Sequence, residues 1–188
     1  MYPDKNLETT LTDILSNLTD TQAREVLKQM AANDPQIAKL IKATATNMLE
    51  AVDLEEVAEE VFFAFDAIDV EVCWERAGSH RDGYTAPEDA ANELIEEELA
   101  PFSDQIRKYH DLGMAAQERD YLMGVILGLY RYATESKSSF RDWSEDLPLE
   151  SAGWLLEEYQ KRAPNKNTIQ TMQSFISKHC PNWKKHLS

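Results

Sequence analysis

Four glutamates near the middle of the chain are spaced for one face of a helix, and carboxylates are the side chains that bind hard divalent cations. They are Glu55, Glu56, Glu59 and Glu60. Residues four positions apart are neighbours on a helix, so each glutamate of the first pair faces one of the second. Such a face can hold magnesium, attract a basic partner, or be the hydrated side of an amphipathic helix. The hydrated side is favoured, because repulsion between exposed carboxylates costs only about a few tenths of a kcal/mol per pair.

A family resemblance bears on the hypothesis that the four glutamates bind magnesium. An all-helical chain with a Glu-Glu-x-x-Glu helix opening resembles the MazG-like nucleotide pyrophosphohydrolases. The resemblance implies a metal-dependent hydrolase in which the four glutamates hold magnesium. That family also carries Glu-x-x-Asp downstream on a facing helix. None follows the cluster in this sequence, since Glu93 is followed three residues later by Glu96. A hydrolase is therefore an alternative hypothesis and not the leading one.

No other pattern predicts catalysis or a cofactor. A di-iron bundle needs Glu-x-x-His on two helices, and none of the four histidines has a glutamate three positions before it. Cys73 and Cys180 do not have the spacing of a tetrahedral zinc site, and we expect them to be buried thiols. No glycine-rich phosphate loop and no Gly-x-Ser-x-Gly turn is present. We expect no catalytic residue, no bound metal and no cofactor.

The net charge is concentrated in one quarter of the chain. Residues 50–98 hold 17 acidic and two basic residues, which equals the net charge of −15 of the whole chain. Residues 161–188 hold six basic residues and no acidic one. This distribution favours a basic protein surface as partner and disfavours nucleic acid as the main ligand, because phosphate would be repelled. It also allows salt-sensitive self-association between the acidic and basic segments.

An aromatic and basic segment between two acidic helices is a second candidate for partner binding. Trp74, Arg81 and Tyr84 can form a recognition surface beside the four glutamates. The alternative is that Trp74 and Tyr84 fill the hydrophobic core, which their large apolar area favours.

The elements that position these residues are predicted to be helices. Apolar residues recur three and four positions apart along most of the chain. Helix-start signals occur at Thr19, Asp34 and Asp53, and residues 85–88 have the form of another capping box. The predicted fold is all-α, with seven to nine helices in a bundle or a stack of antiparallel helical hairpins.

Three segments carry more specific expectations. Residues 115–134 are apolar nearly all round, which predicts a central helix whose Gly124 and Gly128 let a neighbouring backbone approach. Pro101 is expected to kink or interrupt its helix, because its ring clashes with a carbonyl one turn earlier. Residues 68–84 are interpreted as helix or turn and a polar loop, with no convincing strand pair.

The length favours one domain. A subdivision into N-terminal helices (1–52), an acidic central core (53–163) and a basic C-terminal helix (164–188) is possible. No apolar run reaches 18 residues and no secretory signal pattern opens the chain, so we expect a cytoplasmic protein without a membrane partner.

Two stretches resemble the helical regions that accompany bacterial SWIM-type zinc-finger proteins. The first is the leucine pattern of residues 11–27 followed by Asn33-Asp34-Pro35-Gln36-Ile37. The second comprises Gly83-Tyr84, Ala90-Ala91-Asn92-Glu93-Leu94, Leu99-Ala100-Pro101-Phe102 and Gly124-Val125-Ile126-Leu127-Gly128-Leu129-Tyr130. The resemblance covers roughly two thirds of the chain, and the zinc finger itself is missing. It implies a tetratricopeptide-like helical module of undefined biochemical role.

The leading hypothesis is a non-catalytic, acidic helical module that binds a basic partner protein. The candidate partner-binding residues are Glu55, Glu56, Glu59, Glu60, Trp74, Arg81 and Tyr84. The alternatives are the metal-dependent hydrolase that uses the four glutamates, and a nucleic-acid mimic that occupies the basic groove of a DNA-binding protein.

Overall fold

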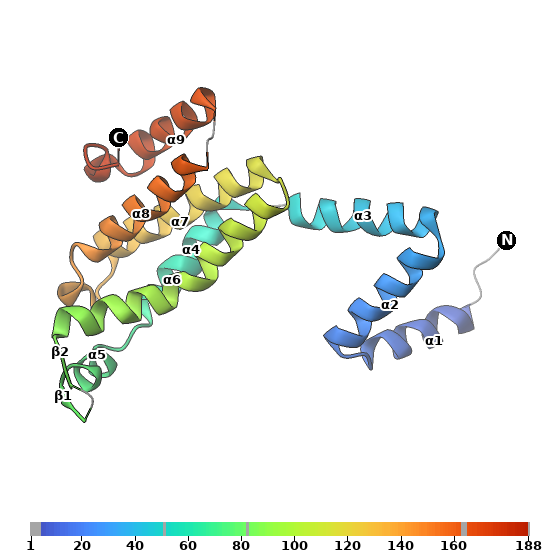
Figure 1. The fold of residues 1–188 in the computed structure, drawn as a ribbon, viewed down its shortest axis with the longest axis horizontal. Coiled ribbons are helices and arrows are strands. Elements are labelled where there is room, and N and C mark those ends of the chain that lie inside the picture. Colours follow the sequence, from blue (N-terminus) through green and yellow to red (C-terminus); the bar gives the residue numbers. More distant parts are fainter. Residues whose placement is uncertain (1–4, 51, 82, 163–164, 188) are drawn as a thin grey trace. The chain divides into compact units, whose positions relative to one another are not determined.

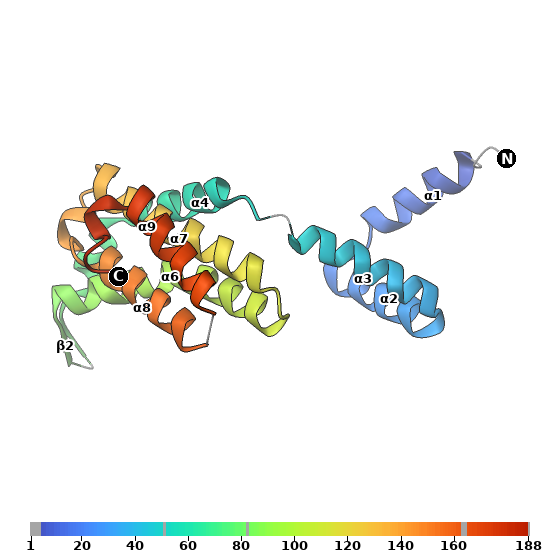
Figure 2. The same cartoon turned by 90° about the horizontal axis from the view of Figure 1, so that it is seen from above.

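The structure, a computed structural model, describes residues 5–50, 52–81, 83–162 and 165–187. Within these ranges it contains nine α-helices, two 3-10 turns and one short hairpin, which confirms the predicted all-α class. Contacts divide the chain into an N-terminal unit, Met1–Ala51, and a C-terminal unit, Val52–Ser188 (Figures 1 and 2). The possible boundary between residues 163 and 164 lies outside the described residues.

The N-terminal unit contains α1 (Lys5–Ser16), α2 (Asp20–Asn33) and α3 (Pro35–Glu50). Its predicted helix starts are confirmed by hydrogen bonds. Thr19 and Gln22 form a reciprocal capping box, and the carboxylate of Asp34 accepts the backbone N–H of Gln36 at 2.7 Å.

The apolar faces of this unit are not buried, contrary to the inward orientation that their spacing predicts. Six residues of α1 and α2 are among the exposed large hydrophobics: Leu11, Ile14, Leu15, Val26, Leu27 and Met30. Helix α2 packs on α3, yet no side chain described between residues 11 and 49 is buried. Helical spacing shows that a face is apolar, but a core forms only where a second apolar face covers it.

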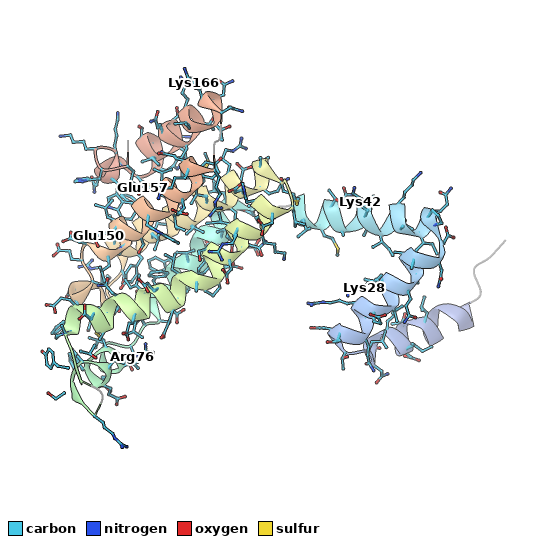
Figure 3. All side chains as sticks on the ribbon, in the orientation of Figure 1. Lys28, Lys42, Arg76, Glu150, Glu157 and Lys166 are labelled. Atoms are coloured by element: carbon cyan, nitrogen blue, oxygen red, sulfur yellow. The ribbon has the colours of Figure 1, made fainter. Side chains whose placement is uncertain are left out.

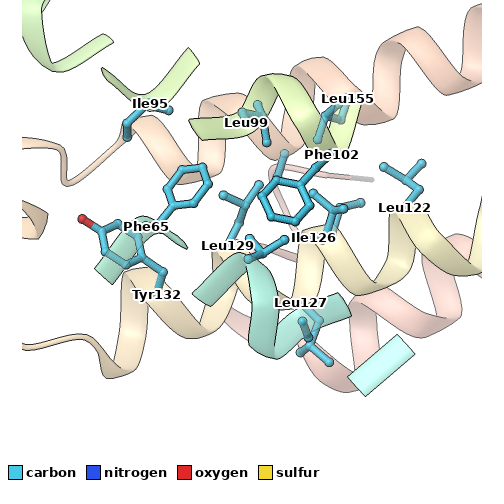
Figure 4. Close-up of a cluster of buried hydrophobic side chains, with 14 of the residues drawn as sticks. Phe65, Ile95, Leu99, Phe102, Leu122, Ile126, Leu127, Leu129, Tyr132 and Leu155 are labelled. Carbon is cyan, nitrogen blue, oxygen red and sulfur yellow. The ribbon is translucent and has the colours of Figure 1, made fainter. Parts of the chain in front are cut away.

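The C-terminal unit contains six α-helices around one core. They are α4 (Leu54–Asp66), α5 (Val70–Arg76), α6 (Pro87–Asp111), α7 (Ala115–Glu135), α8 (Leu147–Lys161) and α9 (Lys166–His179). Helix α7 packs against α4, α6, α8 and α9, and it is the central helix that the sequence predicts. Figure 4 shows its side chains among those of α4, α6 and α8.

The glycines of α7 determine how closely α4 approaches. A Cβ on Gly124 would lie 2.7 Å from the Cβ of Val57, a distance that real Cβ atoms do not adopt. Gly128, one turn later, faces Val61 in the same way. The prediction that these glycines serve close packing is confirmed.

Helix α6 differs from expectation at its start, and Pro101 does not interrupt it. Its N-cap is Ala86, without a side-chain hydrogen bond, because Thr85 is paired as a strand residue and does not cap the helix. Pro101 lies inside α6, which continues unbroken on both sides of it. The buried side chains of Leu99 and Phe102 lie on either side of the proline in the sequence.

A short hairpin follows α5, where the sequence predicted a loop without strand pairing. Strand β1 (Gly78–His80) pairs antiparallel with β2 (Gly83–Thr85). Both strands begin at a glycine with positive φ, 105° at Gly78 and 142° at Gly83, which other residues rarely adopt. The helical part of this segment is confirmed as α5.

The only two 3-10 turns in the described ranges, Arg141–Trp143 before α8 and Pro181–Trp183 after α9, close the fold. Trp183 is buried, with its ring edge-on to that of Tyr130 at 5.2 Å. No helix in the described ranges has both the length and the apolar character needed to cross a bilayer.

Candidate functional site

The four glutamates lie on the first turns of α4, with their side chains exposed. Asp53 caps this helix by accepting the backbone N–H groups of Glu55 and Glu56 at 3.0 and 3.3 Å. Val57 and Val61 face α7, and this packing turns the acidic side of α4 outward. Acidic side chains near a helix N-terminus are favourable, so the sequence builds this face at little cost.

Only one of the four glutamates has an ion-pair partner in the described part of the chain. Glu55 accepts a hydrogen bond from the guanidinium of Arg131 at 2.6 Å, which joins α4 to α7. No group of three or more His, Cys, Asp or Glu residues is arranged to hold a metal ion in the described ranges. The four acids thus form an exposed charged face, and the magnesium hypothesis stays a prediction.

The aromatic candidates are exposed, so the interpretation that they fill the core is wrong. The exposed fraction is 52% for Trp74 and 70% for Tyr84, and Arg81 is also exposed. Helix α5 has only seven residues and directs Cys73 into the core, which leaves Trp74 outside. Tyr84 lies on a two-stranded hairpin, where Gly83 beside it is also exposed.

The structure instead brings Trp74 to a distant tryptophan. Its ring lies edge-on to that of Trp143, with the centroids 6.3 Å apart. Trp143 belongs to the turn before α8, so this contact joins the α5 segment to a different acidic region of the chain.

A groove runs between α6 and α8, with a volume of about 490 Å³. Both helices pack on α7 more extensively than on each other. One face of α6 and one face of α8 form its walls. The lining residues are Asn92, Ile95, Glu96, Leu99, Ala100, Ser103, Leu147, Glu150, Ser151 and Trp154.

The groove continues toward the start of α6 as a second hollow. The two hollows share Asn92, Leu147 and Glu150. The extension is lined in addition by Glu88, Asp142, Trp143, Ser144, Glu145 and Asp146. We refer to both hollows together as the α6–α8 groove. Trp143 places the Trp74 contact at one end of it.

Uncompensated negative charge lines this groove. Five carboxylates form no salt bridge with any residue of the described ranges: Glu88, Glu96, Glu145, Asp146 and Glu150. Asp142 is paired with Arg141, and among the described residues no lysine or arginine lines either hollow. Figure 3 shows Glu150 and Glu157 on α8; Glu157 lies beside a further hollow that Trp154 also lines.

The sequence analysis did not identify the α8 side of this groove. Residues 142–158 contain six acidic residues and no basic one. This acidic run does not show in the net charge, because basic residues elsewhere in the chain balance it. None of Glu55, Glu56, Glu59 and Glu60 lines the groove.

A buried carboxylate at the start of α7 has a structural role. Glu118 Oε2 lies 3.2 Å from Nδ1 of His110 in α6, and its Oε1 accepts a hydrogen bond from Arg162 at 3.2 Å. The carboxylate therefore connects the ends of three helices. Burial, followed by the charge of Glu118, raises the pKa of nearby Tyr159 to about 12.

The two thiols are buried and unpaired with each other, as expected. Burial raises the pKa of Cys180 to about 12 and also raises that of Cys73. Since the thiolate is the nucleophile, neither side chain is activated for covalent chemistry.

Comparison of the chain with protein-family models, with curated proteins and with solved structures finds no match. The resemblances to SWIM-associated helical regions and to MazG-like enzymes therefore stay expectations from the sequence.

Proposed function

We propose that this chain is a non-catalytic helical interaction module that binds a basic partner protein through the acidic surface of its C-terminal unit. The observation that supports this most is the α6–α8 groove. Its five carboxylates have no ion-pair partner in the described ranges, and they surround apolar side chains. A basic partner would supply both the missing countercharge and the missing apolar cover.

The charge of the unit extends this attraction beyond the groove. Residues 52–188 hold 27 acidic and 14 basic residues, a net charge of −13. A field of one sign steers an oppositely charged protein toward the surface and raises the association rate. The exposed glutamates of α4 contribute to this steering, whereas the groove supplies contacts that persist after encounter.

The experiment is affinity capture from the native host lysate at low and at high salt. The wild type is compared with two quadruple variants. One carries Gln at Glu55, Glu56, Glu59 and Glu60, and the other carries Gln at Glu88, Glu96, Glu145 and Glu150. A control variant removes the same charge elsewhere, through Asp13→Asn, Glu25→Gln, Asp111→Asn and Glu135→Gln.

We expect a basic protein that the wild type and the control variant recover at low salt, and that at least one acidic-surface variant loses. The purified partner should bind the purified chain with an association rate that falls as salt rises. Equal recovery by all four proteins, or no recovery of any protein at low salt, would contradict the proposal.

A thermal-shift measurement with magnesium and manganese, with and without nucleoside triphosphates, addresses the hydrolase alternative. A bound divalent ion stabilises the fold by about 2.7 kcal/mol at a hundredfold excess over Kd. Stabilisation that the α4 variant abolishes would favour the hydrolase over the interaction module.

A further inference from the structure

The α6–α8 groove has the length of a short helix. Its α6 wall extends from Glu88 to Ser103, fifteen positions along one helix. At about 1.5 Å per residue, this wall is roughly 22 Å long, which a helix of about 15 residues covers. The α8 wall, from Leu147 to Trp154, lies along the same space.

The floor of the groove is apolar. Ile95 and Leu99 form its base with 2% and 5% of their surface exposed, and Leu147 is half-buried beside them. Trp154 remains 49% exposed at the α8 wall. A tryptophan left half uncovered beside a hollow is an anchoring side chain for an incoming apolar residue.

Carboxylates lie on both sides of this floor. Glu88 and Glu96 belong to α6, whereas Asp146 and Glu150 belong to the start of α8. A complementary ligand therefore carries one apolar stripe between two basic flanks. An amphipathic helix presents that pattern, because residues at i, i+3, i+4 and i+7 share a face and its neighbours flank them.

We propose that the α6–α8 groove binds a basic amphipathic α-helix of the partner protein. Its apolar face lies on Ile95, Leu99 and Trp154, while lysine or arginine side chains reach Glu96 and Glu150. The aliphatic stems of these basic residues cover the walls, and a cation over the indole of Trp154 adds a cation–π contact. This inference rests on the proposed function and specifies the form of the partner.

The test uses isothermal titration calorimetry of the full chain with synthetic helices of about 15 residues. The first peptide contains Leu at i, i+3, i+4 and i+7 positions and Lys elsewhere. The second has the same composition reordered so that the leucines share no face. The third replaces every Lys of the first with Glu. We expect that only the first peptide binds, or that it binds at least about tenfold more tightly than the second.

Two pairs of variants locate the binding. Trp154→Ala is expected to weaken the first peptide about 30-fold, whereas Phe63→Ala, which removes an exposed aromatic from α4, leaves it unchanged. The double variant E96Q/E150Q is expected to weaken binding about tenfold, whereas D111N/E135Q, with the same change in charge at exposed positions outside the groove, has little effect. Thermal unfolding of each variant establishes that it is folded.

The outcomes separate this inference from the proposed function. Equal binding of the first and second peptides, or an equal loss in E96Q/E150Q and D111N/E135Q, overturns the helix-binding groove and leaves a basic partner in place. If neither lysine peptide binds, the inference that the groove binds a basic helix is wrong, and the result also counts against a basic partner.

Discussion

Gly128 of α7 lies against the backbone carbonyl oxygen of Ala58 in α4, so closely that a Cβ on the glycine would stand 2.6 Å from that oxygen. The same Cβ would stand 2.6 Å from the Cβ of Val61. A carbonyl oxygen cannot rotate away as the end of a long side chain can. The two helices therefore keep their separation only while this position has no side chain.

Gly128→Ala is expected to destabilise the C-terminal unit by about 1–3 kcal/mol, because the added methyl group forces α4 and α7 apart. This loss outweighs the gain of about 1 kcal/mol that alanine brings to a helix interior. Urea unfolding followed by circular dichroism measures the change.

Gly153 of α8 is the matched control. A Cβ there would meet only the Cδ2 of Leu187, at an ordinary contact distance of 3.7 Å. Gly153→Ala should therefore stabilise the chain by about 0.5–1 kcal/mol. Equal effects of the two substitutions would show that Gly128 does not govern helix packing.

Pro101→Ala is expected to stabilise the chain by about 1–3 kcal/mol, because it restores a helix hydrogen bond at an exposed position. Pro87→Ala, at the first turn of the same helix, should change stability little, since proline removes no hydrogen bond there. Urea midpoints of the two variants provide the comparison. A loss of stability on replacing Pro101 would mean that α6 depends on its proline.

Glu118→Gln is expected to destabilise the chain by about 1–2 kcal/mol, since it leaves Arg162 without its charged partner in a largely buried setting. Glu158→Gln breaks only the exposed contact with Lys161 and should produce no measurable change. Both variants are measured by thermal and urea unfolding. Equal stability of the two would remove the structural role of Glu118.

Alkaline pH should weaken the fold through its buried phenols. Burial, followed by the nearby Glu60, raises the pKa of Tyr121 from 10.0 to about 12, and burial likewise raises that of Tyr159 to about 12. The unfolded chain releases these protons first, so the stabilising contribution is complete below pH 10 and is lost as the pH rises toward 12.

Urea unfolding at a series of pH values through that window measures the loss. Tyr121→Phe and Tyr159→Phe should each make stability fall less steeply with pH. Identical slopes in the wild type and both variants would contradict the assignment.

The sequence predicts the features of this fold that local rules determine. Capping at Thr19, Asp34 and Asp53 depends on neighbouring residues. The apolar residues on nearly all sides of α7 are evident from the sequence of that helix alone. The hairpin was not predicted, because each strand has only three residues and shows no alternation of apolar and polar side chains.

Features that depend on distant segments were not predictable in this way. Helix α6 continues through Pro101 and packs on α7, and that packing is not visible in the segment itself. The groove brings together Glu96 of α6 and Glu150 of α8, which are 54 positions apart in the chain. The apolar periodicity of Leu11 and Leu27 is real, yet it does not determine whether another face covers them.

The exposures of the four tryptophans divide them into one buried ring and three rings that report on the groove. Trp183 is 7% exposed, whereas Trp154 lies in the groove wall, Trp143 at its end, and Trp74 edge-on to Trp143. Indole emission shifts to shorter wavelength when water is excluded from the ring. The tryptophans therefore report on binding without an added label. A ligand that fills the groove shifts the emission of the wild type to shorter wavelength, and the shift is smaller in Trp154→Ala.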